Sequence, residues 1–374
     1  MDDGHVSRDF GMTTAPSDRR AILKGALGGV LCVGSALGTP LGHGPAMAAA
    51  PRKIPFGAAV RGDALAADAA YGAALADRCR LLVPEGGLKW PVLRPNRETF
   101  DFGEADRIAA FARRNGLGLR GHTLAWYGGM PAWAEAITSP VEAEWVLTSH
   151  IETVVSRYRG FIGSWDVVNE PMPDNPASPQ DLRRFVWTKT LGAEYIPIAF
   201  KAAHAADPAA RLVLNEYDIE YVGPRFAQRR AGILAIARSL LDRGIPIHAI
   251  GLQAHLFADR ELDRDGLQSF LREIKAMKLD VLVTELDVID AGLPTDFATR
   301  DAIVAKKAAD FLQAVDEVTP PSAVLTWGIT DRYTWVPIYF TRSDGTANRP
   351  LPLDSDLRPK PLMNVIERFT GSAS

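Results

Sequence analysis

The chain has 374 residues, enough for one large domain or two ordinary ones, and its 47% apolar and 23% charged residues are ordinary for a soluble globular protein. The formal net charge is −3, and no lysine- or arginine-rich tract is interleaved with aromatic residues. This composition argues against nucleic acid and against an acidic membrane surface as partners.

The N-terminal segment has the features of an export signal rather than of a folded domain. Arg19 and Arg20 form a twin-arginine pair, residues 25–37 are apolar and rich in glycine, and Ala46-Met47-Ala48 is a small-x-small cleavage pattern. The apolar run is too short to span about 30 Å of hydrocarbon as a helix. We therefore expect residues 1–48 to be a signal peptide for the twin-arginine route.

Removal of this signal would leave residues 49–374 as the mature protein, located in the periplasm or secreted, without a membrane contact. Cys32 would be lost with the signal, and Cys79 would remain as the single cysteine, so no internal disulfide is expected. The sequence gives no indication of assembly, and a monomer is the default expectation.

From residue 54 onward, short apolar or β-branched runs alternate with longer segments of helical periodicity. The predicted strands are residues 55–60, 80–84, 117–125, 164–169, 211–216, 249–256, 280–287 and 323–330. The runs are mostly apolar, as expected for parallel strands that are covered by helices.

Helical segments lie between these strands. They are predicted over residues 64–78, 104–114, 141–158, 180–206, 225–243, 262–277, 300–317 and 361–369. Eight alternating β and α units predict a parallel sheet that closes into a single (β/α)8 TIM barrel, and no linker divides the mature chain.

Polar residues lie at or just after the carboxyl ends of seven predicted strands. They are Glu85, His122, Glu170, Glu216, His255, Glu285 and Trp327. Active sites of such barrels form at this face. Ordinary strands also end in polar loop residues, but that explains one or two such positions and not a carboxylate or imidazole at six strands.

Two of these carboxylates have the placement that glycosidic bond hydrolysis requires. Residues 165–171 (WDVVNEP) close the fourth strand, and residues 283–288 (VTELDV) lie in the seventh. The fourth and seventh strands lie across a barrel from each other, so Glu170 and Glu285 can flank a sugar over its mouth. One carboxyl group protonates the leaving oxygen, and the other attacks the anomeric carbon or activates a water.

Both motifs resemble those of glycoside hydrolase family 10, and the resemblance covers roughly residues 54–366. Further segments that resemble the family are residues 121–126 (GHTLAW), 191–217, 250–256 (IGLQAHL) and 326–336 (TWGITDRYTWV). The resemblance implies a retaining β-glycosidase, most often an endo-1,4-β-xylanase that cleaves xylan or xylo-oligosaccharides by double displacement.

The same resemblance implies roles for individual residues. Glu170 is similar to the family's acid/base and Glu285 to its nucleophile, while Asn169 matches the residue that holds the sugar's 2-hydroxyl or the nucleophile. His255 and Asp287 match supports of the nucleophile. Asp287 lies two residues after Glu285, so both side chains point to one side of the strand, where His255 could bridge them.

A shell of sugar-binding residues is implied in the same way, because a sugar needs flat aromatic rings and hydrogen-bonding groups. Its members are Glu85, Lys89, His122, Trp126, Gln253, Trp327 and Trp335. Two positions depart from the family: Gly86 replaces an Asn, and Gly129 replaces a Gln, both of which normally bind the second glycone sugar. We therefore expect intact chemistry with altered glycone recognition.

Other functions remain open at this point. Another β-1,4-glycanase, cellulase-like or cleaving aryl β-glycosides, shares the Asn-Glu-Pro and Thr-Glu motifs, and a non-catalytic carbohydrate-binding barrel is a third reading. We find no His/Cys spacing suited to zinc, no G-x-S-x-G elbow and no P-loop, so no metal or cofactor is expected. The expected partner is a polysaccharide or oligosaccharide substrate.

Overall fold

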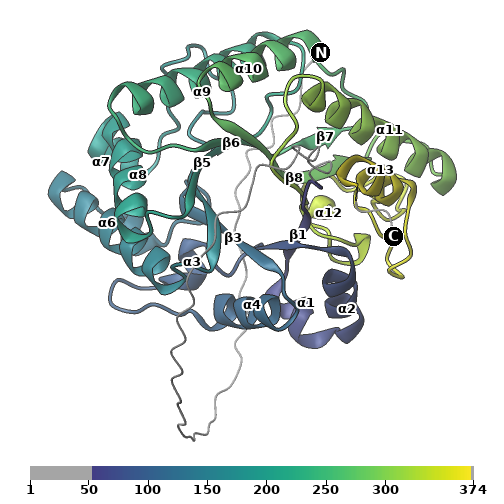
Figure 1. Cartoon of the computed structure of the whole chain (residues 1–374), viewed down its shortest axis with the longest axis horizontal. Coiled ribbons are helices and arrows are strands. Elements are labelled where there is room, and N and C mark those ends of the chain that lie inside the picture. Colours follow the sequence, from purple (N-terminus) through teal and green to yellow (C-terminus); the bar gives the residue numbers. More distant parts are fainter. Residues whose placement is uncertain (1–52, 372–374) are drawn as a thin grey trace, which may run out of the picture. The chain divides into compact units, whose positions relative to one another are not determined.

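Parallel strands form a closed barrel in the computed structural model, which describes residues 53–371 (Figure 1). The strands are β1 (Phe56–Val60), β2 (Leu81–Pro84), β3 (Gly118–Ala125), β4 (Ile162–Asn169), β5 (Arg211–Glu216), β6 (Ala249–Leu252), β7 (His255–Phe257), β8 (Asp280–Ile289) and β9 (Val324–Thr326). Neighbouring strands pair in chain order from β1 to β6, β6 pairs with β8, and β9 returns to β1. The signal expected in residues 1–48 lies outside the described residues.

Helices surround this barrel (Figure 1). They are α1 (Gly62–Ala67), α2 (Ala69–Arg78), α3 (Trp90–Leu93), α4 (Gly103–Arg114), α5 (Ala132–Glu135), α6 (Pro140–Arg157), α7 (Val186–Leu191), α8 (Tyr195–Ala206), α9 (Pro224–Asp242), α10 (Arg264–Ala276), α11 (Phe297–Asp316), α12 (Val336–Tyr339) and α13 (Pro361–Thr370), with 3₁₀ turns η1 (Gly192–Glu194) and η2 (Asp331–Tyr333). The described helices include none that is long and apolar enough to cross a bilayer.

The predicted (β/α)8 barrel is confirmed, with two corrections to its strands. The sixth predicted strand is broken into β6 and β7, because Ala254 between them has a φ of +59°. The eighth strand ends at Thr326, so Trp327 already belongs to the following loop. Two of the helix predictions also need correction.

The first corrected helix, predicted over residues 64–78, divides into α1 and α2 at Asp68. The Asp68 carboxylate accepts hydrogen bonds from the backbone N–H groups of Ala70 and Tyr71, at 3.0 and 3.1 Å, and so caps α2. The second, predicted over residues 180–206, is wrong at its start because α7 begins at Val186, and η1 separates α7 from α8.

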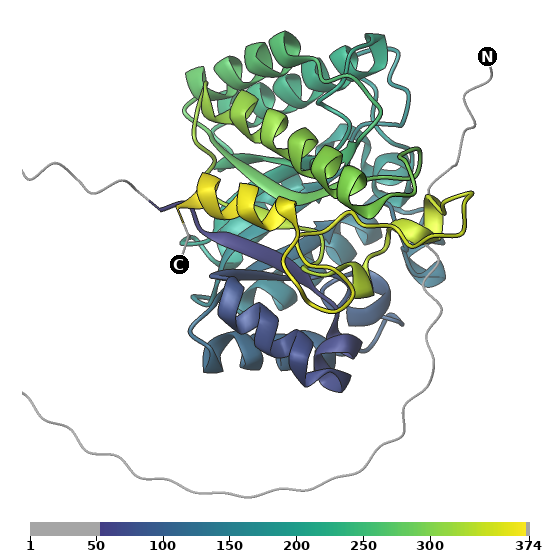
Figure 2. The same ribbon diagram turned by 90° about the vertical axis from the view of Figure 1, so that its right-hand side faces the viewer.

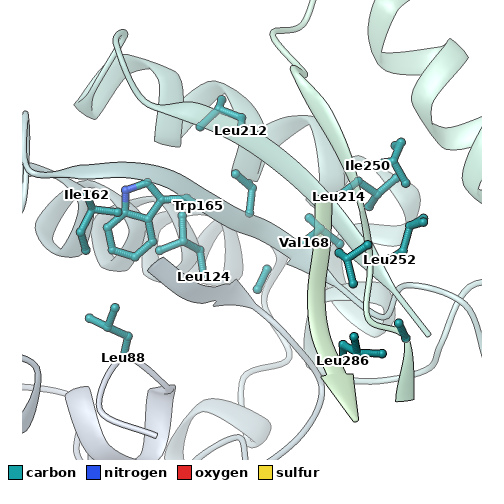
Figure 3. Packing of buried hydrophobic residues seen from close by; sticks show 14 of the residues in the cluster. Leu88, Leu124, Ile162, Trp165, Val168, Leu212, Leu214, Ile250, Leu252 and Leu286 are labelled. Carbon is teal, nitrogen blue, oxygen red and sulfur yellow. The ribbon is translucent and has the colours of Figure 1, made fainter. Parts of the chain in front are cut away.

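The core is divided between the two faces of the barrel wall. Alternate strand residues belong to different buried clusters: Leu82 and Leu212 pack with helix residues, whereas Val83 and Val213 belong to a smaller cluster that we assign to the barrel interior. Figure 3 shows part of the larger cluster, including Leu88, Leu124, Ile162, Trp165, Val168, Leu212, Leu214, Ile250, Leu252 and Leu286.

The two ends of the described chain lie together, away from the carboxyl ends of the strands. The start of β1 and the end of α13 lie side by side (Figure 2). A Cβ atom added to Gly371 would be 3.8 Å from Cγ of Lys53. Both chain ends are therefore at the amino end of β1, opposite the face on which the polar residues gather.

Candidate active site

A chain of hydrogen bonds runs beside Glu285 in β8. Oε2 of Glu285 is 3.2 Å from Nε2 of His255, and Nδ1 of the same ring is 2.9 Å from Oδ1 of Asp287. Trp335 completes the chain, since its Nε1 donates to Oδ2 of Asp287 at 2.7 Å. The geometry therefore places His255 between Glu285 and Asp287, as the alternation of side chains along the strand suggests.

This chain of hydrogen bonds contributes to the charge state of Glu285. Burial alone would raise the pKa of Glu285, but the hydrogen bond from His255 and the nearby His122 and Lys89 side chains lower it to about 2. Burial likewise opposes the charge of His255, yet the two carboxylates raise the pKa of His255 to about 10. At neutral pH the pair is a carboxylate beside an imidazolium.

Glu170 is held differently, through one of its two carboxyl oxygens. Its Oε1 accepts hydrogen bonds from Nε2 of Gln253 at 2.9 Å and from Nδ2 of Asn169 at 3.2 Å. Its Oε2 is buried and has no hydrogen-bond partner among the described residues. With both donors on Oε1, a proton on the carboxyl group must be carried by Oε2.

Asn215 of β5 connects the two glutamates, and the sequence analysis missed it. Its Nδ2 donates to Oε1 of Glu285 at 2.7 Å and to Oδ1 of Asn169 at 2.9 Å. The sequence held a signal for Asn215, because an Asn-Glu pair lies at the carboxyl end of both β4 and β5. In the structure Asn169 pairs with Asn215 in the sheet. The second glutamate, Glu216, is instead buried against Arg229 at 2.9 Å.

His122 of β3 lies next to the hydrogen-bond network of Glu285. Its Nδ1 is 3.0 Å from Oδ2 of Asp166 and 3.9 Å from Oε1 of Glu285, and Arg120 also binds Asp166. Suitable ligand atoms of His122, Asp166 and Glu285 lie within 4.8 Å of one another, close enough to hold a metal ion. Hydrogen bonds to Arg120, His255 and Asn215 already engage both carboxylates, so protein contacts alone account for the cluster.

Four of the predicted sugar-binding residues lie together, namely Lys89, His122, Trp126 and Trp327, while Gln253 contacts Glu170 and Trp335 contacts Asp287. Nζ of Lys89 is 4.7 Å from the ring centroid of Trp126 and 5.6 Å from that of Trp327, and the His122 ring is edge-on to Trp327 at 5.0 Å. Lys89 is buried, yet its Nζ makes no hydrogen bond to a described residue, and only the backbone of Lys89 is hydrogen-bonded. Glu85 is half-buried as a whole residue, and desolvation of its carboxyl group raises the pKa of Glu85 to about 7.

Glycines shape the loop that follows Trp126. A Cβ atom added to Gly128 would be 2.4 Å from the Trp126 ring, so the backbone packs directly against the indole. Gly129 has a φ of +66°, a conformation that L-residues rarely adopt. The backbone of this loop therefore requires glycine at residue 129, and a residue with a side chain there would be strained.

Comparison with protein families gives a match over most of the chain. The model described as glycosyl hydrolase family 10 matches residues 46–368. The endo-1,4-beta-xylanase 1 of Humicola insolens is 35% identical over 317 residues, which is 83% of this chain and 70% of the fungal protein. The beta-1,4-xylanase of Dictyoglomus thermophilum is 35% identical over 298 residues, 77% of this chain and 81% of that protein.

Solved structures agree with these sequence matches. The xylanase 10B of Thermotoga petrophila RKU-1, crystallised with xylobiose, has a TM-score of 0.77 and 29% identity, over 86% of this chain and 94% of that one. A glycosylated endo-beta-1,4-xylanase of Gloeophyllum trabeum has a TM-score of 0.75 and 29% identity, over 86% and 97%.

Proposed function

This chain belongs to glycosyl hydrolase family 10, and on that premise we propose that it is an endo-1,4-β-xylanase in which Glu170 and Glu285 perform a double displacement. The chain is a retaining glycoside hydrolase, and its substrate is a β-1,4-linked polysaccharide or oligosaccharide. The observation that supports Glu170 as the acid/base is that its two carboxyl oxygens have different partners. Oε1 is fixed by two N–H donors, which leaves Oε2 for the glycosidic oxygen.

In the first step Glu285 attacks the anomeric carbon while Glu170 transfers its proton to the leaving oxygen. The low pKa of Glu285 keeps it ionised at neutral pH. The attack needs both carboxyl groups on opposite sides of the bond, about 5–5.5 Å apart in a retaining enzyme. Asn169 and Asn215 hold the two groups in one connected network.

In the second step Glu170 takes a proton from water, and the hydroxide displaces Glu285 from the sugar. Formation of the ester has by then removed the negative charge of Glu285, and Glu170, which gave its proton to the leaving oxygen in the first step, accepts the proton of the water. His255 and Asp287 hold the departing carboxylate in place as its charge returns. The sugar leaves with its original β configuration.

Reaction of variants with azide tests the roles of Glu285 as nucleophile and Glu170 as acid/base. With an activated aryl β-xylobioside and azide, Glu285→Ala should give the α-glycosyl azide, because azide replaces the attacking carboxylate from the opposite face. Glu170→Ala should give the β-azide, since azide then attacks the intact glycosyl-enzyme. On xylan without azide, both variants should lose at least about 100-fold in rate. Identical azide products from the two variants would reject the assignment.

The sugar-binding shell supports a second candidate, a β-1,4-glycanase with altered glycone preference. Lys89 lies near the rings of Trp126 and Trp327, and Gly86 and Gly129 stand where the family has an Asn and a Gln, so neither offers a side chain to a second sugar. Two lost hydrogen bonds, each about 0.5–1.5 kcal/mol, would weaken that subsite about ten- to a hundredfold. The ratio of kcat/KM for aryl xylobioside and aryl cellobioside decides between the candidates: strong preference for xylobioside retains the xylanase.

Export is the remaining part of the proposal. The segment of residues 1–48 supports transport of the mature chain, residues 49–374, by the twin-arginine route, where proteins cross already folded. Replacing Arg19 and Arg20 by lysine should leave full-length protein in the cytoplasm, as detected by fractionation. Unchanged export would reject this route but not the catalytic assignment.

A further inference from the structure

Arg183 lies beside the active site and contacts three strand ends, although neither the sequence nor the catalytic scheme assigns it a role. Its guanidinium carbon is 4.0 Å from the ring centroid of Tyr127, just after β3. Its Nη2 donates to Oδ1 of Asp174 at 2.9 Å and to the hydroxyl of Tyr217, just after β5, at 2.7 Å. The side chain is only 10% exposed, so these contacts fix its position.

The third contact is with Glu170 itself, just after β4. Nε of Arg183 donates to the backbone oxygen of Glu170 at 3.2 Å, and the backbone N–H of Arg183 donates to the oxygen of Pro171 at 2.7 Å. The backbone N–H of Glu170 donates to the oxygen of Asn215 at 2.9 Å. Both backbone polar groups of Glu170 are therefore held by protein partners.

This support matters because Glu170 has an unusual backbone conformation. Its φ is +55°, in the left-handed region that few residues other than glycine adopt. This backbone conformation sets the direction of the Glu170 side chain. If Glu170 left the conformation, its carboxyl group would move away from Gln253 and Asn169. Arg183 ties the end of the 170–185 segment to its start, through Nε to the oxygen of Glu170 and through its backbone N–H to the oxygen of Pro171.

We propose that Arg183 is a positioning residue for general acid catalysis: by binding the backbone oxygen of Glu170, Asp174 and Tyr217 together, it aims Oε2 of Glu170 at the leaving oxygen. The inference rests on the proposed role of Glu170 as acid/base. A guanidinium is required because its planar fork reaches the backbone oxygen through Nε and the two side chains through Nη2 at once. A lysine keeps the charge but can form only part of this set.

The test is the dependence of the rate on the leaving group. A 2,4-dinitrophenolate leaves without a proton, whereas a sugar hydroxyl needs one, so misplacing the acid slows only the second kind of substrate. In Arg183→Lys, kcat/KM for xylohexaose should fall about 10- to 100-fold, while that for 2,4-dinitrophenyl β-xylobioside should change less than about threefold. Azide should accelerate turnover of the dinitrophenyl substrate by this variant and yield the β-azide.

Two controls separate positioning from a general structural effect. Arg184→Ala removes the neighbouring arginine, whose exposed side chain has no hydrogen bond or ion pair with a described residue, and it should leave both rates unchanged. Labelling of Glu285 by a 2-deoxy-2-fluoro glycosyl inhibitor should persist in Arg183→Lys, which would show that the barrel and the nucleophile are intact.

The outcomes are distinguishable. Equal losses on both substrates, or no loss on either, would overturn the role of Arg183. Glu170→Ala is the benchmark: if this variant shows the leaving-group signature and Arg183→Lys does not, only the inference about Arg183 fails. If Glu170→Ala itself lacks the signature, the acid/base assignment fails, and the role of Arg183 falls with it.

Discussion

His255 is the residue on which the charge of the proposed nucleophile depends most directly. In His255→Asn, the imidazolium would no longer oppose the effect of burial on Glu285, whereas His122 and Lys89 still would, so the pKa of Glu285 should rise from about 2 part of the way toward its ordinary value. The acid limb of the pH dependence of kcat/KM should therefore move upward by about 1–2 pH units. An activated aryl glycoside is the suitable substrate, because it reports attack without proton transfer.

A matched comparison is Trp335→Phe, which keeps an aromatic ring, loses the hydrogen bond to Asp287 and should shift this limb less. An acid limb that stays in place in His255→Asn would contradict the account.

The pair of Glu285 and His255 also affects the stability of the fold. The lowered pKa of Glu285 stabilises the fold above about pH 4.5, and this contribution is lost as the pH falls toward 2. The contribution of His255 is complete below pH 6.5 and is lost as the pH rises toward 10.

The break between β6 and β7 is the strand feature that places most of this chemistry. Gln253 binds Glu170 on one side of the break, and His255 binds Glu285 on the other. Ala254 between them has a φ of +59° and is fully buried. A β-branched residue adopts this conformation poorly, so Ala254→Val should destabilise the protein by about 1–3 kcal/mol in urea unfolding and reduce activity on xylan.

Ala254→Gly is the matched comparison, since glycine adopts this conformation without strain, and it should be close to neutral. If Ala254→Val were as stable and active as Ala254→Gly, the left-handed turn would not be required. An unbroken strand through residues 249–256 would alternate sides regularly, and Gln253 and His255 would then lie on one face together.

Some elements of this fold can be predicted from the sequence and others cannot, for physical reasons. Apolar runs identify the strands well, because β2, β4 and β8 are buried along nearly their whole length. The break at Ala254 could not be predicted, since alanine carries no signal for a positive φ. The short helices α3 and α12 were also missed, because four residues are too few to show helical periodicity.

At the site, position at a strand end and the family resemblance together pointed to residues that the structure brings into one network, Asn169, Glu170, Gln253, His255, Glu285 and Asp287 among them. The contacts of Asn215 and Arg183 were not foreseen. Arg183 lies in a segment predicted as helix, so its position beside Glu170 depends on a loop path that periodicity does not reveal.

For the molecule as a whole, the core contains a histidine that should limit stability in acid. The His150 ring is fully buried, stacks on Trp90 at 3.6 Å, and neither ring nitrogen has a partner among the described residues. Burial, with a smaller effect of Arg94, lowers the pKa of His150 well below 6.5. The unfolded chain binds this proton below pH 6.5 and the folded chain does not, so the free energy of unfolding falls by about 1.4 kcal/mol per pH unit there.

His150→Phe keeps an aromatic ring in the stack and removes the titration. The loss of stability between pH 7 and pH 5, measured by urea unfolding, should be about 2 kcal/mol smaller in this variant than in the parent chain. Equal losses in both proteins would show that His150 already binds its proton in the folded state.

The two ends of the described part of the chain, Lys53 and Gly371, meet at the amino end of β1, and this has a consequence for engineering. Lys53 and Gly371 are close enough for a short glycine-serine bridge, while the mouth with Glu170 and Glu285 lies at the other end of the strands. A circular permutant joined there and reopened in a loop at the amino face would keep every catalytic contact. A second protein fused at either end would likewise leave the path of a long polysaccharide across the mouth unobstructed.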